Sequence, residues 1–388
     1  MRCISALSTA RTMNAAFHQI LEKFDEQSGE EPADLCLIFS SMHHVDEVGR
    51  MASLLIEQGR ALHVLGCTAE SVAGEAREVE GSPALAVLAV FAPGMTIEPI
   101  RLDAPDSSPA SFAARVGEDR SGRALIFLAD PFSFRTDEFL RQVNADLRGL
   151  RVVGGMASGS QVPRGNQLIL DDQAYLDGAV AMLLGGPVGV RMLVSQGCRP
   201  VGHTMIVTSA ENNVIRELGR RPALEVLRTV FQDLSQEDRR RIQDGLHIGR
   251  VINEYQGEFG RGDFLVRNVM GADTTGAIQI NDIVRVGQTV QFHVRDADTA
   301  DDDLRLGLLK VRDDPARTSK PAGALLFSCN GRGTRLFKAP DHDIRTIRDV
   351  FPDLPVAGFF AMGEVGPIGG QNFVHGYAAS ILLLEDRA

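Results

Sequence analysis

Polar residues near the end of the chain have types and spacing that suit small-molecule chemistry. Cys329, Asn330 and Arg332 stand in "FSCNGRG", directly after one apolar stretch, and Glu364 stands in "GFFAMGE", after another. One guanidinium opposite one carboxylate suits a zwitterion or a carboxylate ligand, because Arg holds a carboxylate through two hydrogen bonds and a carboxylate accepts an ammonium. Two such bonds with some apolar burial give about millimolar to micromolar affinity. The alternative is that Arg332 and Glu364 only pair with each other.

Further candidates surround Glu364 in a glycine-rich stretch. Gly363 precedes it directly, and "GPIGGQNFVHG" then supplies an amide at Asn372 and an imidazole at His375. We therefore predict a ligand-binding set, without catalytic residues, that comprises Cys329, Asn330, Arg332, Gly363, Glu364, Asn372 and His375.

Cys329 raises an alternative, a cysteine-dependent hydrolase or transferase. A nearby guanidinium would lower the thiol pKa, and His375, or His342 beside Asp343, could serve as the base. The stretch matches no known nucleophile signature, however, and free cysteine is commonly a small buried hydrophobe. The main prediction is therefore a protein that is not an enzyme.

No nucleotide or metal motif is present. "GGMASG" lacks the G-x-G-x-x-G spacing, and no G-x-x-x-x-G-K-[ST] occurs. No Lys or Arg lies between Arg348 and Arg387, so local side chains offer no cation to a phosphate. His43 and His44, with His63 later, have no further ligand at motif spacing. We expect no cofactor and no metal.

Composition limits the partners and the compartment. The 388 residues carry a formal net charge of -11, which argues against nucleic acid as a partner. No apolar run reaches the roughly 18 to 20 residues that span a bilayer, so membrane insertion is not expected. Five cysteines without any C-x-x-C pair indicate a reduced compartment, and we predict a cytoplasmic protein.

Three stretches share an order of elements that predicts a repeated β-α-β-β unit. Each has a short apolar strand, a helix with one apolar face and two further strands. A Phe closes each first strand and Gly-x-x-Ala follows in each second strand: Phe39, Phe127 and Phe327; Gly66 to Ala69, Gly154 to Ala157 and Gly358 to Ala361. The strands are expected at 34–41, 63–70 and 84–90, at 123–130, 151–159 and 177–184, and at 323–331, 355–364 and 376–384.

Strands joined through a helix indicate parallel pairing with both faces of the sheet covered. The predicted fold class is therefore α/β, with two sheets stacked face to face and helices outside, in α-β-β-α layers. Parallel strands end at the same sheet edge, where open α/β sheets bind ligands. Residues 40–44, 329–332 and 362–366 are expected at such edges.

The character of the sequence changes after residue 221. A helix is predicted over 222–245, begun by Pro222. The runs "GDFLVRNVMG", "GAIQI" and "DIVRVGQTVQFHVRD" then predict an antiparallel meander. We place the domain boundary near 221, which gives domains 1–221 and 222–388.

Several motifs in order resemble the FIST family, in its N-terminal and C-terminal halves. They cover about residues 34 to 370: "GCTAESVAGE", "VVGGMASG", "GCRPVGHTMIVTSAENNVIRELGRRPALEVL", "GDFLVRNVMGAD", "FSCNGRG" and "GFFAMGEVGPIGG". The resemblance implies a sensory domain of bacterial signalling that binds small ligands such as amino acids, and it implies no catalytic residues.

The function expected from these observations is a ligand-binding sensory protein. Its ligand would be an amino acid or a small carboxylate. The chain shows no kinase, cyclase or receiver segment, so the signal would pass to a partner protein in trans. A protein-interaction scaffold is the second alternative, because eukaryotic relatives recruit substrates in F-box proteins.

Overall fold

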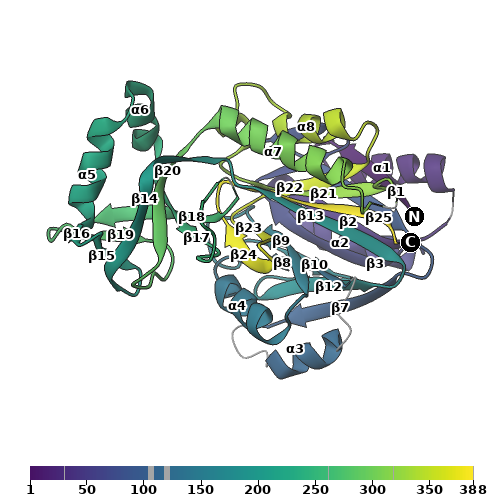
Figure 1. Ribbon diagram of the computed structural model, residues 1–388. Coiled ribbons are helices and arrows are strands. Elements are labelled where there is room, and N and C mark those ends of the chain that lie inside the picture. The colour runs from purple at the N-terminus through teal and green to yellow at the C-terminus, as the bar shows by residue number, and fades with distance from the viewer. Residues whose placement is uncertain (30, 104–108, 118–122, 261, 318, 388) are drawn as a thin grey trace. The chain divides into compact units, whose positions relative to one another are not determined.

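The computed structural model describes residues 1–388 except 30, 104–108, 118–122, 261, 318 and 388. The chain divides into two compact units, one made of residues 1–194 and 304–388 and the other of residues 195–303 (Figure 1). The second unit is thus an insertion within the first.

The first unit contains three six-stranded sheets. In spatial order, the first sheet comprises β1 (Arg2–Ser8), β6 (Leu85–Phe91), β2 (Ala33–Ser41), β3 (Ala61–Ala69), β10 (Leu168–Leu170) and β11 (Gln173–Tyr175). The second comprises β24 (Gln371–His375), β23 (Glu364–Ile368), β9 (Arg151–Met156), β8 (Ala124–Ala129), β12 (Ala179–Gly185) and β7 (Thr96–Leu102). The third comprises β13 (Val188–Ser195), β25 (Ala379–Asp386), β21 (Gly323–Cys329), β22 (Val356–Ala361), β4 (Ser71–Gly74) and β5 (Arg77–Glu80).

The central strands of each sheet have the same arrangement. β2 and β3, β8 and β9, and β21 and β22 are parallel pairs, each joined through a helix, and the later strands β6, β12 and β25 pair antiparallel with the first member. The paired strands approach closely at glycine. A Cβ on Gly154 would lie 1.8 Å from the Phe127 oxygen, and one on Gly358 would lie 1.8 Å from the Leu326 oxygen. Only glycine fits these positions.

Hairpins are exchanged among the three sheets. The β4–β5 hairpin follows β3 of the first sheet but pairs with β22 of the third. Likewise, β10–β11 follows β9 but pairs with β3, and β23–β24 follows β22 but pairs with β9. Distant parts of the sequence therefore meet at the strand ends.

One core lies between the sheets and others lie beneath the helices. Buried residues of all three sheets, among them Phe39, Ile126 and Phe327, form the central cluster. The outer faces are covered by α1 (Met13–Ser28) and α2 (Val45–Glu57), by α3 (Pro109–Val116) and α4 (Thr136–Asp146), and by α7 (Ala297–Arg312) and α8 (His342–Val350). Strands buried on both faces explain the continuous apolar runs of the sequence.

The second unit contains a closed barrel. Its strands are, in order, β14 (Cys198–Glu211), β20 (Thr289–Arg295), β17 (Leu246–Val251), β18 (Phe264–Ala272), β19 (Ile278–Ile280) and β15 (Val214–Leu218), with β16 (Arg221–Pro222) beside β15. The long strand β14 pairs with β20 and also with β15, which closes the sheet and removes free strand edges. α5 (Ala223–Asp233) and α6 (Gln236–Asp244) belong to this unit.

The α/β class predicted from the sequence is confirmed. The sequence predicted two stacked sheets. This number is wrong, because a third sheet contributes to the central core. The expected antiparallel meander is found only in part: β18 pairs with β19, but β20 pairs with β14 and β17, and all these strands belong to the closed barrel. Among the described residues, no helix has both the length and the apolar character needed to cross a bilayer.

Candidate functional site: a buried ionic cluster

Cys329 is the last residue of β21, and Asn330 and Arg332 lie in the turn that follows. The Asn330 amide donates to the Ala361 oxygen of β22 (3.0 Å), and the Arg332 amide donates back to the Cys329 oxygen (2.8 Å). Gly333 follows in the left-handed region, with φ of 57°. A Cβ there would lie 2.6 Å from Glu80 Oε1 and 2.8 Å from Phe360, so the turn needs glycine. The chain reversal turns the Arg332 side chain inward.

Arg332 is fully buried and pairs with Asp343 at the start of α8. Its Nε donates to Asp343 Oδ2 (2.8 Å) and its Nη2 to Oδ1 (2.7 Å), and the Ser328 hydroxyl also donates to Oδ2 (2.8 Å). Burial by itself would raise the pKa of Asp343, but the Arg332 charge outweighs it and holds that pKa well below its usual range. The alternative considered from the sequence, that Arg332 and Glu364 only pair with each other, is wrong, because the bidentate partner of Arg332 is Asp343.

Glu364, at the start of β23, is also fully buried. Its Oε2 accepts a hydrogen bond from the Ala378 amide (2.9 Å), while its Oε1 has no partner among the described residues. Burial raises the pKa of Glu364 to about 8, against the effect of the Ala378 bond. The carboxyl therefore keeps its proton to a higher pH than an exposed glutamate does.

Glu78, on β5, also belongs to the cluster, although it lies in the first third of the sequence. Its Oε1 accepts from the Ile344 amide (2.9 Å), and its Oε2 is buried without a partner among the described residues. Burial, together with the Asp343 charge, raises the pKa of Glu78 to about 8. No sequence signal pointed to Glu78, because only the exchange of the β4–β5 hairpin brings it to α8.

Cys329 is half-buried, and its sulfur accepts a hydrogen bond from the Gly331 amide (3.3 Å). Burial raises the pKa of the thiol, and the neighbouring Glu364 charge raises it further. The hydrolase or transferase alternative relied on a nearby guanidinium to lower this pKa. The structure gives the opposite direction, since burial dominates.

The other sequence candidates have local structural partners. Asn372 Oδ1 accepts from the Val152 amide (2.8 Å) and its Nδ2 donates to the Leu150 oxygen (2.9 Å), which links β24 to the first residues of β9. His375 Nε2 lies 2.9 Å from the Gly366 oxygen. Gly363 has φ of 150°, and a Cβ there would lie 2.3 Å from the Met156 methyl group. It permits the crossing of the chain from the third sheet to the second.

His342 also has neighbours near the start of α8. Its Nδ1 lies 3.0 Å from Asp343 Oδ1, and its ring stacks on Phe337 with the centroids 3.3 Å apart. Both histidines considered as bases for Cys329 therefore make other contacts.

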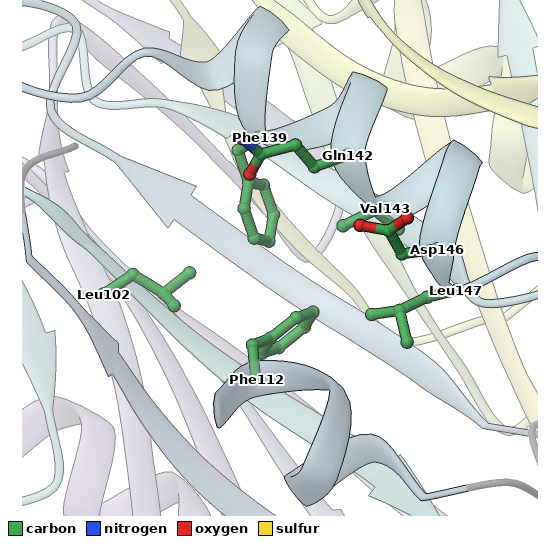
Figure 2. Close-up of a pocket in the computed structure, with 7 residues that line it drawn as sticks. All are labelled: Leu102, Phe112, Phe139, Gln142, Val143, Asp146 and Leu147. Carbon is green, nitrogen blue, oxygen red and sulfur yellow. The ribbon is translucent and has the colours of Figure 1, made fainter. Parts of the chain in front are cut away.

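Several cavities lie away from this cluster. One lies between α3 and α4 and is shown in Figure 2; it is lined by Leu102, Phe112, Phe139, Gln142, Val143, Asp146 and Leu147. Its volume of about 10 Å³ corresponds to one water-sized probe, so this cavity admits no organic ligand as it stands.

The fold and the cluster define a mixed α/β protein with an inserted barrel and a buried ionic site. The FIST N domain family matches residues 34–221 and the FIST C domain family matches residues 223–367. The chain belongs to the FIST family. FIST domains are generally associated with sensory signal transduction.

Two relatives cover nearly all of the chain. An uncharacterized protein of Mycobacterium bovis, Mb0898c, is 39% identical over 386 residues, which are 99% of this chain and 98% of that protein. An uncharacterized protein of Mycobacterium tuberculosis, Rv0628c, is 39% identical over 389 residues, the full length of both. The two family matches meet near residue 221, within the second compact unit, so the family division and the compact units differ.

Proposed function

We propose that this protein is a sensor that binds a small carboxylate, amino acids included, at Cys329, Asn330, Arg332 and Glu364. The supporting observation is a set of buried polar atoms in the cluster that lack partners among the described residues: Arg332 Nη1, Glu364 Oε1, Asn330 Oδ1 and Glu78 Oε2. Folded proteins leave few such atoms unsatisfied, because each costs about 1 to 3 kcal/mol. A small polar ligand would supply the missing partners.

The chemistry of these atoms favours a carboxylate. Arg332 Nη1 is a donor, and the protonated Glu364 is a second one. Both suit carboxylate oxygens. Asn330 Oδ1 is an acceptor and suits the ammonium of an amino acid. Cys329 and Asn330 are only half-buried, so a ligand would approach past them.

A thermal-shift screen of glycine, alanine, glutamate, acetate and propionate tests this proposal. A ligand at 100 times its dissociation constant should stabilise the protein by about 2.7 kcal/mol. We expect Glu364→Met to abolish the shift. The matched control is Glu385→Met, which removes another buried carboxyl of the same unit and should keep the response.

Asn330→Ala separates the two ligand groups. It should weaken amino acids more than acetate or propionate, because it removes only the acceptor for the ammonium. If no compound stabilises the protein, or if the Glu364 and Glu385 variants lose the response together, the proposed site is wrong.

The thiol gives a separate prediction about the hydrolase or transferase alternative. Because burial raises the pKa of Cys329, little thiolate forms at neutral pH, and we expect slow labelling by iodoacetamide at pH 7 that accelerates above pH 9. Mass spectrometry of the full chain, with Cys329→Ser as control, measures the rate at that residue. Fast and complete labelling of Cys329 at pH 7 would favour the enzyme alternative.

We also propose a cytoplasmic location and transfer of the signal to a partner protein. Cys3, Cys36, Cys67 and Cys329 form no disulfide, which agrees with a reducing compartment. If a partner binds while no small ligand does, the scaffold alternative is favoured instead.

A further inference from the structure

The second unit contains a cavity of about 170 Å³ beside α5. This helix packs against β14, β15 and β16 (Figure 1). The cavity lies between α5 and β14, and Arg221 on β16 also lines it. An apolar cavity of about 150 Å³ holds a benzene molecule. The cavity beside α5 is therefore large enough for one aromatic ring or one short branched chain, unlike the cavity between α3 and α4.

An irregularity in β14 forms one wall of the cavity. The pairing of β14 with β20 shifts register between Val201 and Met205, and such a bulge redirects a strand. Gly202 lies within the bulge with φ of 68°, and a Cβ there would lie 2.9 Å from Val230 Cγ1 on α5. Glycine at this position therefore lets β14 come close to α5, so that both elements line the same cavity.

The opposite wall, on α5, is largely apolar. Val226 and Val230 are four residues apart and therefore lie on the same face of the helix. They are 6% and 3% exposed and belong to the hydrophobic core of this unit. Thr229 lies beside Val230 and also lines the cavity. This wall suits the apolar body of a ligand.

Arg221 supplies a positive charge at the end of the cavity where α5 begins. Its Nε (3.2 Å) and Nη2 (2.7 Å) donate to Glu225 Oε1, and Nη2 also donates to the Thr229 hydroxyl (3.1 Å). The last bond holds the guanidinium against a residue of the cavity wall. The Arg221 and Glu225 side chains are 49% and 57% exposed, and exposed ion pairs contribute little stability. A carboxylate ligand can therefore compete with Glu225 for this guanidinium.

The charges along α5 favour one orientation of an anionic ligand. Asp233, the last residue of the helix, lines the cavity at the end away from Arg221 and is exposed. The helix dipole likewise favours an anion at the start of α5 over one at its end. A single carboxylate is thus attracted to the Arg221 end and repelled from the Asp233 end, and a dianion that spans both ends is disfavoured.

We propose that this cavity binds a small monocarboxylate with an apolar body, of the class of benzoate or a short branched-chain acid. The carboxylate pairs with Arg221, because a guanidinium matches the two carboxylate oxygens. The apolar body lies against Val226 and Val230. This site belongs to the second unit and does not depend on the sensor function proposed for the Arg332 cluster.

Calorimetric titration of the full chain with benzoate, and separately with the neutral benzyl alcohol, tests the proposal. Benzoate should bind about tenfold more tightly than benzyl alcohol, the difference expected for one charge-assisted hydrogen bond. Arg221→Gln should weaken benzoate about tenfold and leave benzyl alcohol unchanged. The matched control is Arg228→Gln, which removes an exposed arginine of α5 that does not line the cavity and should change neither affinity.

The variant Thr229→Leu tests whether the cavity itself is the site. The larger apolar side chain fills the space between α5 and β14, so binding of both probes should be lost while urea unfolding still shows a folded protein. Glu364→Met, in the Arg332 cluster, should keep the binding of benzoate, which separates this site from the proposed sensor site.

Four results would overturn the proposal. Neither probe binds the unmodified protein; Arg221→Gln and Arg228→Gln weaken benzoate equally; Thr229→Leu leaves binding unchanged; or Glu364→Met abolishes the binding of benzoate, which would assign that ligand to the Arg332 cluster instead.

Discussion

Asp343→Asn should lower the free energy of unfolding by about 3 to 5 kcal/mol, the usual cost of breaking a buried ion pair by removing one partner. Arg332 and Asp343 are 0% and 1% exposed, so the guanidinium that loses its partner would stay buried and charged. Urea denaturation of the full chain, followed by a probe in the first unit, measures the change.

Two further variants test the physical reason. Asp349→Asn removes one partner of the exposed Arg305–Asp349 pair and should cost less than about 1 kcal/mol. The double variant Arg332→Met with Asp343→Leu should be more stable than Asp343→Asn, because no buried charge remains. If Asp343→Asn is as mild as Asp349→Asn, the pair does not hold the turn after β21 to α8.

Local patterns predicted the strands of the first unit well. In the first of the three stretches, the strands expected at 34–41, 63–70 and 84–90 correspond to β2 (Ala33–Ser41), β3 (Ala61–Ala69) and β6 (Leu85–Phe91). Apolar runs and glycines determine these elements locally. That the three arrangements are copies of one unit stays a proposal.

The alignment of the three stretches was less accurate at single residues. Phe39 and Phe327 belong to the central core, whereas Phe127 packs against α4 through Phe139. Phe127 lies directly opposite Gly154, but Phe39 and Phe327 lie one residue beyond the matching glycines. A shift of one residue turns a side chain to the other face of a sheet, and the sequence spacing alone does not show it.

The candidate site stays a prediction. Cys329 and Glu364 affect each other's pKa, and Arg332 affects that of Glu364, so the three residues lie within electrostatic reach of one another. Asp343 and Glu78 were missed as partners. Asp343 lies on α8, and Glu78 lies on the β4–β5 hairpin, which follows a strand of the first sheet but pairs with the third. Contacts of this kind depend on the assembled fold.

The buried carboxyls should make the protein less stable as the pH rises from 6.5 to 8. Glu364 and Glu78 have pKa values of about 8 in the folded state, above the ordinary value of 4.5. Between these values the folded state binds more protons than the unfolded state, so stability falls with rising pH. Over this window each carboxyl contributes a loss of at most about 2 kcal/mol, and the pair about 4 kcal/mol.

The window is chosen so that other buried groups do not obscure the effect. Burial lowers the pKa of His247 and His293 to about 4, so between pH 4 and 6.5 they make stability rise with pH, the opposite direction. In the unfolded state, with the ordinary pKa of 6.5, both histidines are half protonated at pH 6.5 and about one tenth protonated at pH 7.5, so their opposing slope fades over the lower part of the window and the carboxyls dominate above it.

Urea unfolding at half-unit steps of pH measures this slope. Glu364→Gln should remove about half of it, and Glu364→Gln with Glu78→Gln should remove most of it. Asn372→Ala is the matched control: it deletes buried hydrogen bonds of the same unit without a titrating group, so it should lower stability equally at every pH. A slope that is unchanged in both Gln variants would mean that Glu364 and Glu78 are ionised in the folded protein, and the donor role proposed for Glu364 in carboxylate binding would fail with it.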